Sequence, residues 1–157
     1  MAHAERTLAL YSTFDQPVWE ALALNQVGWC AARLGDYDTA RTRCQAALAL
    51  YREHDSPNGE ADVLDSLGYI DHHTGDHRQA VDHYRRALAL RRTIGNTTSA
   101  ADTLDHLGHP HVALGQVDQA RAAWQEALEL YQRQGRDVDA RRVRQQLDAL
   151  DSDLRIR

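Results

Sequence analysis

The pattern of apolar and polar residues repeats every 40 residues along this chain of 157 residues. When residues 21–60, 61–100 and 101–140 are aligned, eight columns hold the same residue in all three segments. Two of these columns are glycine, at positions 28, 68 and 108 and at positions 35, 75 and 115, and the others are alanine or leucine. So many matching columns indicate an internal repeat.

Within each segment the apolar residues follow a helical period. Ala61, Leu64 and Leu67 lie three residues apart and share one face of a predicted helix, and Ala80 and Tyr84 share a face of the next. No alternation typical of a strand competes with this pattern. Each repeat is therefore predicted to be a helix, a tight turn and a second helix.

The glycines fit two places in such a unit. Gly75 followed by Asp76 supplies a helix-ending glycine and then an N-cap carboxylate, whereas Gln116 after Gly115 weakens the same signal. The glycines at 28, 68 and 108 remove side chains where the two helices of a unit meet, so the backbones can approach closely. One helix pair cannot bury its own apolar faces, and stacked pairs bury them jointly.

These motifs resemble the tetratricopeptide repeat. The second segment carries the family signature at Leu64, Leu67-Gly68, Gly75, Ala80, Tyr84 and Ala87, and the other segments follow the same spacing. The sequence departs from the family three residues after the first glycine, where the family often has an aromatic residue, because Ala31, Asp71 and His111 stand there. The resemblance implies an all-α fold, a right-handed superhelical solenoid of antiparallel helix pairs that binds proteins or peptides.

We expect a single domain over residues 1–157. It comprises a partial repeat at 1–15, repeats at about 16–55, 56–95 and 96–135, and a capping helix at about 136–154. The partial repeat is inferred from Leu8, Leu10 and Tyr11, which lie 40 residues before their counterparts. The polar run from Arg141 to Gln146 suits the outer face of a cap.

The resemblance also implies a partner-binding groove along the first helices. Its residues in this chain are Asn25, Trp29, Arg33, Asp62, Asp65, Tyr69, His72, His73, Asp102, Asp105 and His109. They form an Asn/Asp ladder beside a ladder of rings, and carboxylates beside aromatic faces favour a basic partner through charge-assisted bonds and cation–π contacts. The alternative is that the aspartates only solvate an exposed helix face.

Two further features deserve a prediction. Histidines gather at 72, 73 and 77 and at 106, 109 and 111, but their spacing matches no known ligand motif, so we expect no metal and no cofactor. Pro110 falls inside a predicted helix, where it removes a hydrogen bond and crowds the turn near His106; a kink there would change the curvature of the groove.

Composition and motifs reduce the number of function classes that we expect for this chain. A net charge of -5 argues against a direct nucleic-acid surface. The two cysteines form no disulfide framework, and neither a signal peptide nor a membrane-spanning run is present, so we expect a cytoplasmic protein with no membrane contact. No phosphate-binding loop, HExxH or nucleophile motif occurs, so the chain is not expected to be an enzyme.

The amino-acid sequence of the repeats, as in residues 67–92 and 107–128, resembles the carboxy-terminal repeats of large actinobacterial transcriptional regulators of the SARP type. This resemblance implies a sensory or regulatory part of a larger regulator. Two alternatives remain: a receptor for signalling peptides or small molecules, and a self-association module that forms a homodimer through exposed repeat ends.

Overall fold

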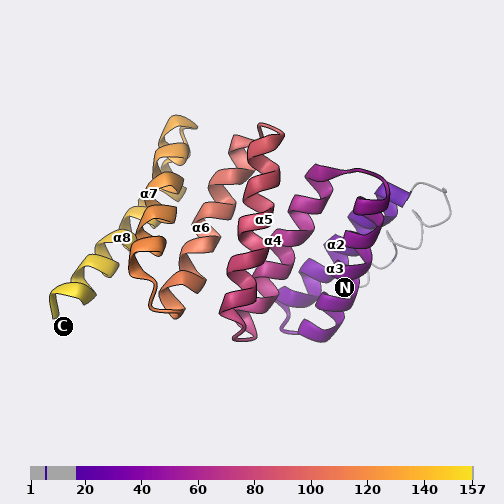
Figure 1. The fold of residues 1–157 in the computed structure, drawn as a ribbon, viewed down its shortest axis with the longest axis horizontal. Helices are drawn as coiled ribbons and strands as arrows, with labels where there is room; N and C mark the ends of the chain where they lie inside the picture. The colour runs from indigo at the N-terminus through magenta and orange to yellow at the C-terminus, as the bar shows by residue number, and fades with distance from the viewer. Residues whose placement is uncertain (1–5, 7–16, 157) are drawn as a thin grey trace.

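The chain folds into a row of α-helices joined by short turns (Figure 1). The structure is a computed structural model that describes Arg6 and residues 17–156. Its regular helices are α2 (Pro17–Arg33), α3 (Tyr37–Glu53), α4 (Pro57–His73), α5 (His77–Thr93), α6 (Thr97–Ala113), α7 (Val117–Arg133) and α8 (Asp137–Ile156). No strand occurs among these residues, so the predicted all-α solenoid of antiparallel helix pairs is confirmed.

Caps and turns explain why the helices begin and end where they do. Asp36, Asp76 and Asn96 each accept a hydrogen bond from the backbone N–H three residues later, which satisfies a free donor of the following helix. Each turn contains a residue with positive φ. This residue is glycine at most turns, but it is Asp55 (φ 48°) before α4. Gln116 forms no such cap, as its side chain instead accepts from His111 Nδ1 at 2.6 Å.

The first glycine column forms sockets for the second helices. A Cβ on Gly28 would lie 2.6 Å from Cys44 Sγ, and one on Gly68 would lie 2.8 Å from the Tyr84 ring. These approaches are closer than side chains tolerate, so the ring or thiol occupies the space that the glycine leaves. Cys44 fills its socket without an aromatic ring and is fully buried.

Stacking of the pairs places the first helices in one layer. Helices within a pair pack most extensively, and each second helix also packs on the next first helix. In addition α2 contacts α4, and α4 contacts α6, so the first helices line a shared inner face. Apolar side chains between the layers form the core, with Val27, Leu64 and Val143 almost completely buried.

Three expectations concern particular segments. The partial repeat at residues 1–15 lies outside the described residues, apart from Arg6. Helix α6 continues through the buried Pro110 to Ala113. None of the described helices is long and apolar enough to cross a membrane.

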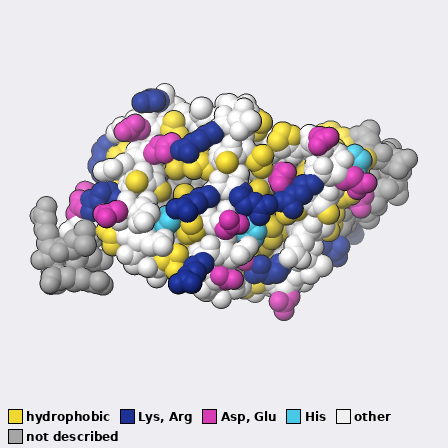
Figure 2. Space-filling view, viewed as in Figure 1, with side chains coloured by type: hydrophobic (Ala, Val, Ile, Leu, Met, Phe, Trp, Pro, Cys, Tyr) yellow, Lys and Arg dark blue, Asp and Glu magenta, His cyan; other side chains and the backbone are white. Residues whose placement is uncertain are grey.

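Side chains of both charges are interspersed on the face shown in Figure 2, where arginines run across the middle with acidic groups beside several of them. Among the described residues, several ion pairs join different helices, as in the pair of Arg92 and Glu126 at 2.6 Å. This face therefore has no single large acidic or basic field, and recognition must depend on local sites.

Candidate functional site

Side chains from the first helices α2, α4 and α6 and one from the second helix α5 enclose a pocket of about 320 Å³ on the inner face. Its lining residues are Trp29, Arg33, Tyr69, His72, His73, Tyr84, His106 and His109. Here we call it the ring pocket. It brings together six of the eleven residues predicted for the groove, all from the C-terminal halves of α2, α4 and α6.

The rings of the pocket contact one another. Trp29 meets Tyr69 edge to face with ring centroids 4.8 Å apart, and Tyr69 stacks on His73 at 3.9 Å. The guanidinium of Arg33 lies over the Trp29 ring, 5.9 Å from its centroid. Such offset and edge contacts hold aromatic side chains in fixed orientations, so the walls of the pocket are preorganised.

Two histidines of the pocket, His72 and His109, have pKa values below the ordinary value, which favours the neutral imidazole. Burial lowers the pKa of His72 to about 4, and the neighbouring His73, His77 and His109 lower it further. Burial also lowers the pKa of His109, although Asp105 opposes this effect. Among the described residues that line the pocket, Arg33 is the only one with a permanent charge.

The aspartates of the predicted ladder are held by arginines from neighbouring helices. Arg91 is only 4% exposed and reaches from α5 to the carboxylates of Asp62, at 3.2 Å, and Asp65. Asp65 also accepts from the Thr103 hydroxyl at 3.0 Å. Each of these bonds replaces water around the carboxylate with a donor of the protein itself.

The same arrangement recurs one repeat later. Arg136 Nη2 lies 2.7 Å from Asp102, and Arg142 Nη2 lies 2.7 Å from Asp105. The Tyr131 hydroxyl donates to Asp102 at 2.9 Å. Both interpretations of the ladder assumed exposed carboxylates, which is wrong for Asp105, only 3% exposed, and for the largely buried Asp65. Both carboxylates form ion pairs within the protein, Asp65 with Arg91 and Asp105 with Arg142.

Asn25 and the histidines complete the comparison with the sequence analysis. Asn25 accepts from Cys44 Sγ at 3.6 Å and does not line the pocket. The two histidine clusters divide: His106 and His109 join His72 and His73 in the pocket, while His111 lies elsewhere. No three His, Cys, Asp or Glu side chains among the described residues are arranged to hold a metal ion.

Two lining residues were missing from the predicted groove. Tyr84 belongs to a second helix, yet it reaches the pocket because Gly68 leaves the space that its ring crosses. His106 follows Asp105 on α6 and lies near Tyr84, with ring centroids 5.9 Å apart. The glycine column facing an aromatic column was a signal for Tyr84, since a ring opposite a missing side chain can pass between helices.

Comparison with solved structures supports the fold. BtubC (BKLC) from P. vanneervenii superposes with a TM-score of 0.68 at 15% sequence identity, covering 89% of this chain and 66% of that one. Aspartyl phosphate phosphatase F from Bacillus subtilis superposes with a TM-score of 0.81, also at 15% identity, covering 91% of this chain and 38% of that one. The chain thus spans less than two thirds of either structure.

Comparison with sequences identifies the repeat. No curated protein sequence matches the chain significantly. A family model described as tetratricopeptide repeat matches residues 2–93, and a second model of the same description matches residues 100–133. Since the first match alone covers more than half of the chain, this protein belongs to the tetratricopeptide repeat family.

Proposed function

We propose that this protein binds an extended segment of a partner protein along its inner face, with the ring pocket as the anchor for one aromatic side chain. Tetratricopeptide repeats are protein-interaction modules, and that coarser assignment follows from the family. The observation that carries the finer proposal is the meeting of Trp29, Tyr69 and His109 around one hollow. At about 320 Å³ its volume is at the small end of the range for ligand sites, about 300–1,000 Å³.

The chemistry of the pocket favours an uncharged ring over a basic side chain. Arg33 already covers the Trp29 ring, and a second cation there would be repelled. The aspartates that would attract a basic segment are paired internally. A peptide aromatic group can instead stack on Tyr69 and on the imidazoles of His72 and His109, whose pKa values are lowered by burial, as rings prefer offset and edge contacts.

Selection from a random peptide library displayed on phage tests this proposal. We expect the selected peptides to share an aromatic residue, and Trp29→Leu to weaken their binding by at least about tenfold, measured by fluorescence polarisation. Trp19→Leu is the matched control, because Trp19 lies on the same helix outside the ring pocket. Equal effects of the two substitutions would contradict the proposal, and enrichment of Lys- and Arg-rich peptides would favour the basic partner instead.

Catalysis has no positive support, so the proposed role is non-catalytic binding. The resemblance of the repeats to SARP-type regulators supports the narrower proposal that this binding regulates transcription. A reporter assay in the native host, comparing wild type with Trp29→Leu, tests it: regulated promoters should respond to the substitution. An unchanged reporter together with lost peptide binding would favour the receptor alternative, and a concentration-dependent mass in light scattering would favour self-association.

A further inference from the structure

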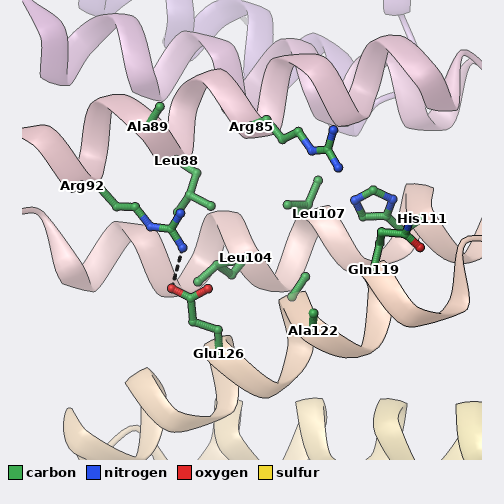
Figure 3. Close-up of a pocket in the computed structure, with 11 residues that line it drawn as sticks. Arg85, Leu88, Ala89, Arg92, Leu104, Leu107, His111, Gln119, Ala122 and Glu126 are labelled. Atoms are coloured by element: carbon green, nitrogen blue, oxygen red, sulfur yellow. Dashed lines mark hydrogen bonds and ion pairs between the residues drawn. The ribbon is translucent and has the colours of Figure 1, made fainter.

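A second hollow lies between α5 and α7, on the side of α6 that faces away from the ring pocket (Figure 3). His109 lines the ring pocket and His111 lines this hollow. Residues at positions i and i+2 of an α-helix lie about 200° apart around its axis, so these two side chains point to nearly opposite sides of α6. The hollow has a volume of about 420 Å³, and its floor is apolar, with Leu88, Leu104 and Leu107. We call it the outer hollow.

The outer hollow exists because the repeats differ at equivalent positions. Between the first two helix pairs, Asp71 accepts from Arg41 Nη1 and binds His83 Nδ1, each at 2.6 Å, so a polar network fills the space. Forty residues later, His111 stands for Asp71 and Ala123 for His83. The alanine leaves the space empty, and the internal carboxylate is lost.

The arginine of that network has no counterpart here, because Val81 stands forty residues after Arg41. A different cation, Arg85, lies four residues further along α5 and lines the outer hollow. Arg85 forms no ion pair with any described residue, and Figure 3 shows its guanidinium directed toward the end of the hollow near His111. By contrast Arg92, at the other end, is paired with Glu126 at 2.6 Å. Burial lowers the pKa of His111, and the charge of Arg85 lowers it further, although the hydrogen bond from its Nδ1 to Gln116 opposes this effect.

We propose that the outer hollow binds an acidic segment of a partner protein, in which an Asp or Glu carboxylate pairs with Arg85 and a neighbouring Leu or Val side chain lies on the apolar floor. The carboxylate would give Arg85 an ionic partner, as Asp71 gives one to Arg41 at the preceding interface. An unpaired guanidinium beside an apolar floor has the two components that such a segment complements. This surface is separate from the ring pocket.

Binding of an immobilised peptide array tests the proposal with the intact chain. The array holds octapeptides that combine Glu or Asp with Leu or Val, each beside its Gln or Asn counterpart. We expect wild type to bind acidic peptides more than the amide counterparts, and Arg85→Gln to weaken this binding about tenfold, as a charge-assisted pair is lost. Arg86→Gln is the matched control, because Arg86 is the next residue and pairs with Asp82 outside the hollow.

A second variant tests the shape of the hollow. Ala123→His restores the residue of the preceding repeat and fills the space, so it should also abolish binding while circular dichroism stays helical. Equal binding of acid and amide peptides, no binding at all, or equal losses with Arg85→Gln and Arg86→Gln would each overturn the proposal. Trp29→Leu should leave the binding unchanged, so failure of the ring pocket proposal is distinguishable.

Discussion

At the scale of single residues, the missing side chains of the glycine column decide how closely the helices pack. A Cβ on Gly108 would overlap the Trp124 ring, whose Nε1 donates to the Asp105 carbonyl at 3.0 Å and is thereby fixed. Gly108→Ala should therefore lower the free energy of unfolding by about 1–3 kcal/mol through overpacking, measured by urea denaturation. The same substitution in a Trp124→Leu background should cost much less, and an equal cost in both backgrounds would contradict this explanation.

His72 gives a residue-scale prediction about pH. Its pKa of about 4 in the folded protein lies below its ordinary value of 6.5, so between these values the unfolded chain binds more protons. Stability should accordingly fall as the pH drops from about 6.5 to about 4, and His72→Gln should flatten this dependence. Urea denaturation at several pH values measures it, and identical slopes for both proteins would show that His72 does not contribute.

At the scale of helices, the pattern of the sequence predicted the pairs well because each repeat carries its own caps, turns and glycine socket. The ring pocket was foreseen in part for the same reason: Trp29, Tyr69 and His109 occupy one column of the repeat. The pairing of the aspartates was not foreseen. It depends on which residue of the neighbouring helix faces them, and Arg91 stands where the adjacent repeats have Tyr51 and Tyr131.

Pro110 is the feature of α6 whose cost can be measured. Proline cannot donate to the carbonyl of His106, so this turn lacks one helical hydrogen bond. Pro110→Ala should raise the free energy of unfolding by about 1–2 kcal/mol, because the bond is restored and only a small volume is lost. Pro57→Ala is the control, since Pro57 begins α4, where proline is favourable. A lower stability of the Pro110→Ala variant would mean that the packing of the pyrrolidine ring contributes more than the missing hydrogen bond.

At the scale of the whole molecule, stability should depend on the interfaces between helix pairs, as in other solenoids. Asp71 is 1% exposed and joins three helices through Arg41 and His83. Asp71→Asn should cost about 2–4 kcal/mol, since a buried charged network loses one partner, and hydrogen exchange should show α2 and α3 opening before the rest. Asp82→Asn, at an exposed pair, should change stability by less than about 0.5 kcal/mol. Uniform opening of all helices would contradict the prediction.

The two hollows give the molecule two faces with different chemistry. The ring pocket has aromatic walls and a single arginine that covers one of the rings, whereas the outer hollow has an apolar floor and an unpaired arginine. The repeat explains both, because one column of rings converges on the inner face and one broken polar network opens the outer face. Neither depends on an exposed acidic ladder.

The central claim is that the inner face binds a peptide through the ring pocket. Its most direct test is an NMR titration of the ¹⁵N-labelled protein with an aromatic peptide selected by phage display. We predict that the largest chemical-shift changes fall on the backbone amides of Trp29, Tyr69 and His109 and on the indole N–H of Trp29. Trp29→Leu should remove the changes at Tyr69 and His109. Shifts confined to the outer face, or shifts that survive Trp29→Leu unchanged, would contradict the account.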